Sequence, residues 1–304
     1  MPKHFRMTGL VPAAFTPMHP DGSLNLTQVA PIVERSVANG VSALFVCGTT
    51  GEAASLSTPE RRAVLEAFIA ASAGRMPVVA HVGHTSLADA RELSAHAQQA
   101  GAAAFSALPP FYFKPPSVEA LVACMADIAA AAPALPFYYY HIPHLSGVSV
   151  DMTAFLGQAA QRIPNLAGIK YTAPTLYEFQ TCAALDDGRF DLLFGVDEML
   201  LAGLATGARG AVGSTYNLAP RLYQAVMARF AAGDHAAAQK LQWLSARMVQ
   251  AVVQYRPLPA LKSMMKLVGI DCGPTRLPMV AMAPAESAAL ERELAEIGFL
   301  EWMR

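Results

Sequence analysis

The stretch ALFVCGTTGEAASLSTPERRAVLEAFIAASAGRMPVVAHVGH (43–84) contains the pattern that decides the fold. It begins and ends with an apolar run typical of a buried strand. Between the two runs, Ser57 or Thr58 precedes a helical segment that has a proline just inside its start and Gly74 at its end. A strand, a helix and a second strand in this order predict a parallel βαβ unit.

The same unit recurs along most of the chain. Helical segments at 25–40 and 86–101 also lie between apolar runs, and both end at a glycine. Eight strand-and-helix repeats predict an α/β fold, a closed (β/α)8 TIM barrel. An open, doubly wound sheet is the alternative, but the eight repeats and the lack of GxGxxG after the first run disfavour it. The eight runs are 9–17, 43–51, 77–84, 103–112, 136–143, 166–172, 191–198 and 209–217.

The signals for strands stop after residue 217, and helical patterns continue to the end of the chain. We therefore predict a barrel domain at 1–218 and a C-terminal helical domain at 219–304. The predicted helices of this extension are 220–232, 234–255, 257–268 and 284–298.

Composition excludes several classes of partner. The formal net charge is −1 and the pI is about 6.7, so the basic stripe of a nucleic-acid-binding protein is not expected. Apolar stretches are broken by proline or acidic residues, and no membrane span or secretory signal is predicted. The cysteines form no CxxC pair, which indicates free thiols in a reducing cytoplasm. They are Cys47, Cys124, Cys182 and Cys272.

The ends of the predicted strands are unusually polar. In a barrel of this kind, the active site lies at the C-terminal ends of the strands, so these residues should meet at one mouth. They are GTTGE at 48–52, Tyr112, Tyr140, His141, Lys170, Thr172, Gly195, Asp197, Glu198 and Ser214.

Lys170 is the candidate nucleophile, because among the lysines it alone ends an apolar strand segment, LAGIK. A buried ammonium is costly unless it is paired, so burial favours the neutral amine, which attacks carbonyl groups. The alternative is a lysine that extends to solvent or forms a salt bridge with Glu52 or Asp197.

Tyr140 is the candidate proton relay. In the run Tyr138–Tyr140, strand alternation sends Tyr138 and Tyr140 to one face and Tyr139 to the other. A phenol near the reacting carbon can move the proton that imine formation and carbon–carbon cleavage require. For each of the three tyrosines, a place in the core is the alternative.

Two other patterns have both a functional and a plain structural interpretation. The glycines and hydroxyls of GTTGE suit the binding of a carboxylate, although an ordinary turn has the same composition. Asp197 and Glu198 suit the binding of sugar hydroxyls, and they would also suit the solvated start of a helix.

The close histidine pairs match no strong zinc motif, and no metal is expected there. They are His81 with His84 and His141 with His144.

Five segments, spread in order over almost the whole chain, resemble the N-acetylneuraminate lyase and dihydrodipicolinate synthase superfamily. Together they are a specific signature, although singly only two of them would be suggestive. The resemblance implies a (β/α)8 barrel with a C-terminal helical domain, assembled as a homotetramer. The segments are GTTGE (48–52), PPFYFKP (109–115), YYYHIP (138–143), GIKYT (168–172), and GVDE with GAVGSTYN (195–217).

The resemblance also implies roles for individual residues. Lys170 is similar to the lysine that forms the Schiff base, and Tyr140 to the tyrosine that relays the proton. Thr49 and Thr50 are similar to the pair that binds the carboxylate of the keto acid. Tyr112 is similar to the tyrosine that reaches into the neighbouring subunit's site.

Within the superfamily, the sequence resembles the lyase branch. The synthase branch binds its second substrate with an arginine at the place of Leu145, and a leucine cannot clamp a carboxylate. His141 stands where many members have asparagine, and Thr49 where some lyases have serine. By resemblance, five residues would contact the hydroxyls of the substrate: Thr172, Gly195, Asp197, Glu198 and Ser214.

The activity implied is that of a Schiff-base aldolase that reversibly cleaves N-acetylneuraminate, a sialic acid, to N-acetylmannosamine and pyruvate. Because the imine supplies the electron sink, neither a metal nor an organic cofactor is expected. The expected partners are small 2-keto acids, with no nucleic acid and no membrane. One alternative is another pyruvate-dependent aldolase or sugar-acid dehydratase of the superfamily, such as a dihydrodipicolinate synthase-like enzyme. A metal-dependent aldolase and a non-enzymatic sugar-acid sensor are the others.

Overall fold

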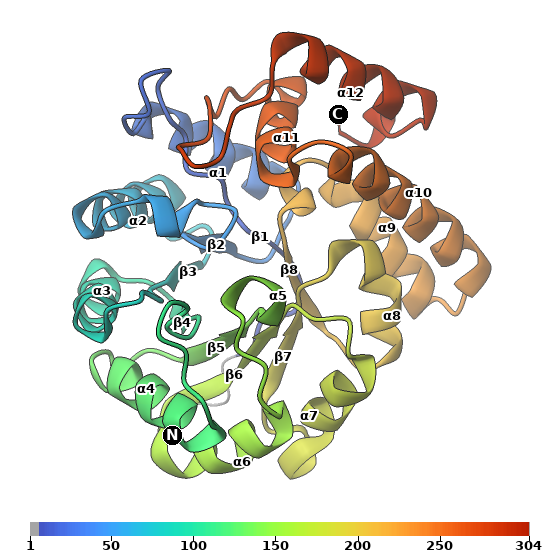
Figure 1. The fold of residues 1–304 in the computed structure, drawn as a ribbon. Coiled ribbons are helices and arrows are strands. Elements are labelled where there is room, and N and C mark those ends of the chain that lie inside the picture. Colours follow the sequence, from blue (N-terminus) through green and yellow to red (C-terminus); the bar gives the residue numbers. More distant parts are fainter. Residues whose placement is uncertain (1–5, 304) are drawn as a thin grey trace.

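A computed structural model describes residues 6–303, and within them eight parallel strands surround one axis (Figure 1). Each strand falls inside one of the eight predicted apolar runs, so the prediction of eight strands is confirmed. The strands are β1 (Gly9–Pro12), β2 (Leu44–Val46), β3 (Val78–His81), β4 (Ala104–Ala107), β5 (Phe137–His141), β6 (Leu166–Tyr171), β7 (Asp191–Phe194) and β8 (Gly210–Gly213).

Neighbouring strands pair in chain order from β2 to β8, and β8 pairs with β1. The remaining gap, between β1 and β2, is bridged by a parallel pairing of Ala13 with Phe45. Ser42 N also donates to Leu10 O at 2.8 Å across this gap. The sheet thus returns to its first strand, which confirms the predicted (β/α)8 barrel and excludes the open, doubly wound sheet.

Inward-facing side chains fill the barrel and form a cluster of their own. Tyr138 and Tyr140 belong to this inner cluster, together with Phe45 and Val79. Tyr139 belongs to the outer cluster and packs on Phe155, with ring centroids 4.6 Å apart. The alternation predicted for the three tyrosines is therefore confirmed.

The helices around the barrel begin where the sequence provides caps. Ser57 and Glu60 form a capping box at the start of α2, in which each side chain binds the other residue's backbone N–H. The helices that follow the first seven strands, including the short α5, are α1 (Val29–Ala38), α2 (Thr58–Ser72), α3 (Leu87–Ala100), α4 (Val118–Ala130), α5 (Pro143–Ser146), α6 (Met152–Arg162), α7 (Leu176–Gly188) and α8 (Leu200–Ala205).

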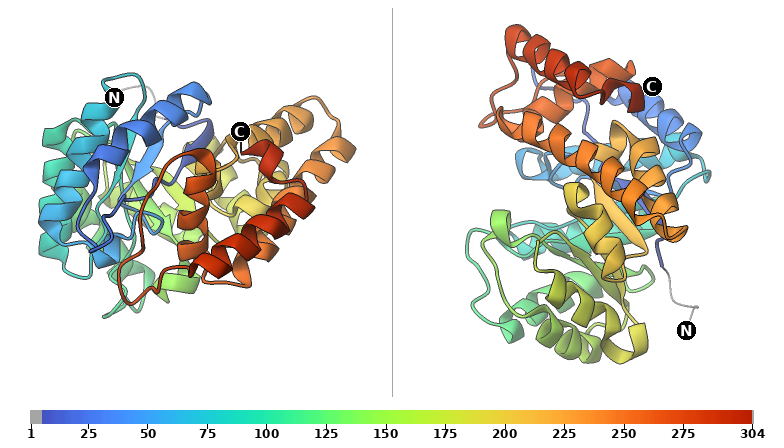
Figure 2. Two further views of the ribbon diagram at one scale, coloured as in Figure 1. Left: turned by 90° about the horizontal axis from the view of Figure 1, so that it is seen from above. Right: turned by 90° about the vertical axis from the view of Figure 1, so that its right-hand side faces the viewer.

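Within residues 6–303, four α-helices follow β8 at the predicted places, and the last three form a layer beside the barrel (Figure 2). α9 packs on both β1 and α10, so it joins the barrel to the helices beyond it. The division into two domains at residue 218 stays a prediction. In residues 6–303, no helix has the length and apolar character needed to cross a membrane. The four helices are α9 (Pro220–Ala231), α10 (His235–Val253), α11 (Pro257–Met264) and α12 (Pro284–Glu296).

Candidate active site

Lys170 and Tyr140 lie opposite each other on adjacent strands, near the C-terminal ends of β6 and β5. The Nζ atom of Lys170 is 4.0 Å from the centroid of the Tyr140 ring and 4.1 Å from that of Phe45. Lys170 is only 3% exposed to solvent. The structure therefore places the amine and the phenol ring in one buried space at the mouth of the barrel.

The salt bridges considered for Lys170 do not form. Glu52 instead pairs with Lys262, with 2.6 Å between Oε1 and Nζ. The carboxylate of Asp197 accepts hydrogen bonds from the backbone N–H and the hydroxyl of Thr215. Both carboxylates thus have other partners, and Lys170 is enclosed by aromatic rings instead.

Tyr140 is held from three sides. Its phenolic oxygen forms a 3.2 Å hydrogen bond with Thr49 Oγ1. The rings of Phe45 and His81 meet the Tyr140 ring edge to face, at centroid distances of 5.9 and 5.7 Å. These contacts fix the orientation of the phenol beside the amine of Lys170.

His81 is a residue that the sequence suggested only as half of a weak metal pair. Burial, and then the charge of Arg61, hold the pKa of His81 well below its ordinary value, so the imidazole is neutral. Its Nδ1 lies 2.8 Å from Cys47 O, and Leu108 N donates to Nε2 at 3.4 Å. His81 therefore orients Tyr140 and links three strand ends, and its position at the end of β3 is the signal that could have identified it.

The segment Gly48–Gly51 forms a tight turn between two residues of left-handed backbone conformation, Cys47 and Glu52. At Gly48, a Cβ would approach the Phe45 ring to 2.7 Å, so only glycine leaves this ring in place. The Thr16 hydroxyl donates to Gly51 O at 2.7 Å and fixes the turn from the side of β1. Thr50 is buried and Thr49 half-buried, which leaves Thr49 at the boundary of the open mouth.

Asp197 faces the same mouth from the end of β7, and it is almost completely buried. Burial raises its pKa from 3.8 to about 6, although the hydrogen bonds from Thr215 oppose this shift. A hydrogen bond of 2.7 Å joins Thr215 Oγ1 to the Tyr223 hydroxyl, and Ser245 Oγ donates to the latter at 2.9 Å. Asp197 is thus the first member of a polar chain that leads into α9 and α10.

Glycines make room for two of the predicted polar side chains. A Cβ at Gly195 would collide with Thr172 Oγ1, and a Cβ at Gly213 would collide with the Asp197 carboxylate. The buried Thr172 hydroxyl oxygen has no hydrogen-bond partner among residues 6–303. A buried polar atom normally has a partner, so this oxygen fits a position that a bound ligand satisfies.

Not all predicted residues lie beside Lys170 within one chain. Glu198 and Ser214 are half-buried; Ser214 follows β8 directly, and Glu198 lies four residues after the end of β7. Tyr112 is 77% exposed, and its ring contacts that of Phe113, which is 85% exposed. Leu145, on α5, is 60% exposed. His141 faces outward instead, because its ring packs on Tyr139 and Tyr171.

Metal ligands are not gathered at the mouth. Among residues 6–303, no group of three or more histidine, cysteine, aspartate or glutamate side chains could hold an ion. The Nδ1 atom of His84 lies 3.8 Å from Asp89 Oδ2, at the start of α3. Burial lowers the pKa of His141 to about 4, so this imidazole is neutral in the outer packing layer.

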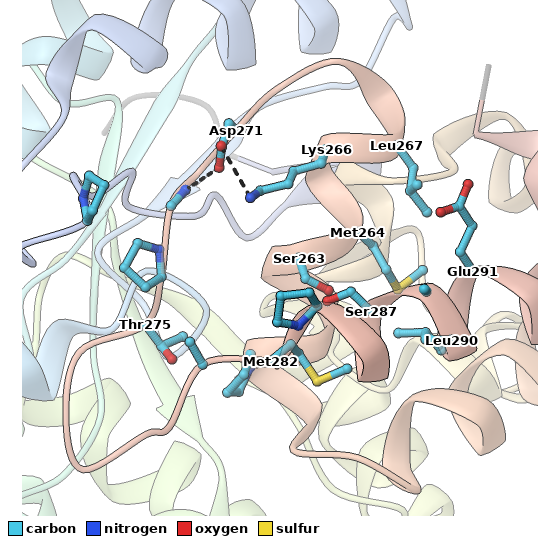
Figure 3. A pocket seen from close by; sticks show the side chains of 17 residues that line it. Ser263, Met264, Lys266, Leu267, Asp271, Thr275, Met282, Ser287, Leu290 and Glu291 are labelled. Carbon is cyan, nitrogen blue, oxygen red and sulfur yellow. Dashed lines mark hydrogen bonds and ion pairs between the residues drawn. The ribbon is translucent and has the colours of Figure 1, made fainter.

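A cavity of about 620 Å³ lies outside the mouth, among the C-terminal helices (Figure 3). It is bounded by α11, the segment 271–275 and α12. An ion pair between Lys266 and Asp271, 3.3 Å long, borders it. Its titratable side chains are Lys266, Asp271 and Glu291, and none of them lies on a strand of the barrel.

The fold and this mouth define a (β/α)8-barrel enzyme with a buried lysine beside a tyrosine at the ends of adjacent strands. The sequence model of the Dihydrodipicolinate synthetase family matches residues 6–297. N-acetylneuraminate lyase from Xenopus tropicalis is 41% identical over 285 residues, which cover 92% of this chain and 93% of that protein. The chain therefore belongs to the Dihydrodipicolinate synthetase family.

Solved structures agree with this assignment. N-acetylneuraminate lyase from Proteus mirabilis is 39% identical, with a TM-score of 0.95 over 97% of this chain and 100% of that chain. A catalytic lysine mutant of Ruminococcus gnavus sialic acid aldolase is 27% identical, with a TM-score of 0.91 over 98% of this chain and 99% of that chain. These relatives share the barrel and the helices beyond it.

Proposed function

We propose that the chain is a Schiff-base lyase that reversibly cleaves N-acetylneuraminate to N-acetylmannosamine and pyruvate. The observation that carries the proposal is the Lys170 amine, buried 4.0 Å from the centroid of the Tyr140 ring at the mouth of the barrel. Relatives that match almost the full length are N-acetylneuraminate lyases, and a catalytic lysine is a feature of the Ruminococcus gnavus enzyme.

The reaction begins with attack of the Lys170 amine on C2 of the open-chain sugar acid. Loss of water gives a protonated imine, which accepts the electrons of the C3–C4 bond when that bond breaks. The C4 hydroxyl gives up its proton and becomes the aldehyde of N-acetylmannosamine. The remaining enamine is protonated at C3, and water then hydrolyses the imine to release pyruvate and the free amine.

Tyr140 is the group best placed to move the proton of the C4 hydroxyl, either directly or through the carboxylate of the substrate. Its hydroxyl is within hydrogen-bond distance of Thr49 Oγ1, 3.2 Å away. A chain of substrate, phenol and threonine hydroxyl can pass a proton without a charged base in the buried site.

The rest of the mouth suits the two ends of the substrate. Thr49, Thr50 and the N–H groups of their turn are placed to bind the carboxylate of the keto acid. The hydroxyl-rich end of the sugar would face the opposite side of the mouth, where the unpartnered Thr172 hydroxyl lies. The residues proposed for that side are Thr172, Gly195, Asp197, Glu198 and Ser214.

Leu145 favours the lyase over a dihydrodipicolinate synthase-like activity. A second substrate with its own carboxylate needs a cation at the mouth, and an alkyl side chain provides none. A neutral residue at this place suits the hydroxylated, uncharged part of a sugar acid. A substrate panel of N-acetylneuraminate and other 2-keto-3-deoxy sugar acids distinguishes these activities.

We propose further that the chain works as a homotetramer in the cytoplasm. Tyr112 and Phe113 expose two aromatic rings beside the mouth, and such side chains are typical of contact surfaces. The free cysteines suit a reducing compartment. The mass of the native protein by light scattering, compared with 32.2 kDa for one chain, tests the assembly.

The direct test of the activity is pyruvate release. Purified protein should release pyruvate from N-acetylneuraminate faster than from any other 2-keto-3-deoxy sugar acid in the panel. Faster turnover of a different sugar acid would assign the chain to another activity of the family. Binding without release of pyruvate would favour the sensor instead.

A further inference from the structure

The turn that carries Thr49 and Thr50 ends at a buried ion pair that the reaction itself does not use. The side chains of Glu52 and Lys262 are 0% and 1% exposed, and Lys262 Nζ donates to Glu52 Oε1 at 2.6 Å. Lys262 belongs to α11 and lies 210 residues after Glu52 in the chain. The pair therefore joins the mouth of the barrel to the C-terminal helices.

Both members of the pair make a second hydrogen bond. Lys262 Nζ donates to Pro274 O at 2.7 Å, and Arg276 N donates to Glu52 Oε2 at 2.9 Å. Each carboxylate oxygen of Glu52 thus has one donor. A buried charge pair with satisfied hydrogen bonds holds its partners in one geometry, whereas a single buried charge strongly favours rearrangement.

The position of Glu52 in the turn makes this geometry relevant to the site. Its backbone is left-handed, with φ of 60°, a conformation that a side chain disfavours unless its surroundings hold it. The backbone N–H of Glu52 donates to Thr49 O at 3.0 Å, and that of Ala53 donates to Gly48 O at 3.2 Å. The carboxylate therefore anchors the residue that closes the turn around both threonines.

We propose that Glu52 and Lys262 are positioning residues, which hold the Thr49–Thr50 turn in the conformation that binds the keto-acid carboxylate. The inference rests on the proposed function, because it assigns that carboxylate to the turn. Through Thr49 Oγ1, 3.2 Å from the Tyr140 hydroxyl, the same anchor also sets the hydroxyl of the proton relay. The C-terminal helices thereby contribute to the site without touching the substrate.

The main test is the pyruvate dependence of borohydride labelling at Lys170 in Lys262→Met. We expect the half-saturating pyruvate concentration to rise roughly ten- to a hundredfold, as for other small displacements of a binding group. Lys266→Met is the matched control, because Lys266 follows on the same segment and forms an exposed ion pair with Asp271 (Figure 3). This control should keep the half-saturation of the unmodified protein.

A second set of variants separates positioning from stability. Lys262→Met leaves a buried carboxylate unpaired, and Glu52→Gln leaves a buried ammonium unpaired, so both should lower the melting temperature. The double variant Glu52→Gln/Lys262→Met contains neither charge, and its melting temperature should recover. Its half-saturating pyruvate concentration should stay raised, because the anchor is still missing. If either single variant does not fold, the half-saturating pyruvate concentration of the double variant tests the proposal.

The proposal is overturned if a folded variant of the pair labels with the same pyruvate dependence as the unmodified protein. Absence of labelling in the unmodified protein would contradict the proposed function instead. In that case, hydrogen exchange of the amides at 48–53 still tests the anchor. Exchange there should be faster in the double variant than in Lys266→Met, and equal rates would overturn the proposal.

Discussion

Tyr138 and Tyr140 lie two residues apart on the inner face of β5, yet their surroundings differ in kind. The N-terminal end of the strands is the closed end of the barrel. There, the Tyr138 hydroxyl donates to Asp191 Oδ2 at 2.7 Å, and Met7 N donates to the same oxygen at 2.8 Å. At the open end, the hydroxyl of Tyr140 meets that of the half-buried Thr49, beside the amine of Lys170.

The comparison shows how one inner face serves two purposes. At the closed end, the carboxylate of Asp191 has two protein donors, so the polar atoms there stabilise the fold. At the open end, the Thr172 hydroxyl oxygen is buried, but no partner for it lies in the described part of the chain. Substitutions at the open end should therefore reduce activity with little effect on stability, and those at the closed end should do the reverse.

The largest effect is expected at the open end, from Lys170→Ala. Without the amine no imine forms, and kcat should fall on the order of 10⁵-fold, as for other covalent nucleophiles. Steady-state kinetics with N-acetylneuraminate measure this loss, and a urea titration should give stability close to that of the unmodified protein. Activity within tenfold of the unmodified protein would contradict the nucleophilic role.

Tyr140→Phe should have the next largest effect. The ring and its contacts with Phe45 and His81 remain, and only the hydroxyl that moves the proton is lost. We expect kcat to fall about 10²- to 10⁴-fold, the usual contribution of a general acid or base. Thr49→Val, which removes the partner hydroxyl, should have a smaller effect on kcat. A loss of less than about tenfold in Tyr140→Phe would assign the proton transfer to another group.

At the closed end, Asp191→Ala should reduce stability and leave kcat almost unchanged. It removes the acceptor of two buried donors, each costing about 1–3 kcal/mol when left unsatisfied. Tyr138→Phe, which removes only one of these bonds, should cost about 1 kcal/mol. Urea unfolding beside steady-state kinetics checks both variants. A large loss of kcat in folded Asp191→Ala would show that the two ends are coupled.

A last effect, smaller than the loss expected for Lys170→Ala, concerns the dependence of stability on pH. Burial raises the pKa of Asp197 from 3.8 to about 6, so in this range the folded state holds a proton that the unfolded chain has lost. The free energy of unfolding should therefore fall as the pH rises from 3.8 to about 6, by about 3 kcal/mol. Asp197→Asn removes this titration, and its stability should change less between pH 4 and 7. An identical pH dependence in both proteins would show that Asp197 has an ordinary pKa.

The sequence predicts those parts of the site that depend on local pattern. Continuous apolar runs mark the eight strands, and strand alternation places Tyr138 and Tyr140 inside. Because parallel neighbours end at the same level, Lys170 and Tyr140 had to be near one another once both ended adjacent strands. These predictions needed only periodicity and the topology of the barrel.

The remaining features depend on contacts between distant segments. Glu52 was considered as a partner of Lys170, but it pairs with Lys262, 210 residues away. No local pattern encodes such a pair, because either residue alone is also typical of a solvated helix or loop. The supporting role of His81 was missed for the same reason, since it arises only when three strand ends meet.

The most direct test of the central claim is to map the residue that borohydride reduction labels in the presence of pyruvate. Mass spectrometry of the digested protein should find the reduced pyruvate adduct on the peptide that contains Lys170. The label should require pyruvate and should disappear in Lys170→Ala. A label on another lysine, or no label at saturating pyruvate, would contradict the assignment of Lys170 as the amine that forms the imine.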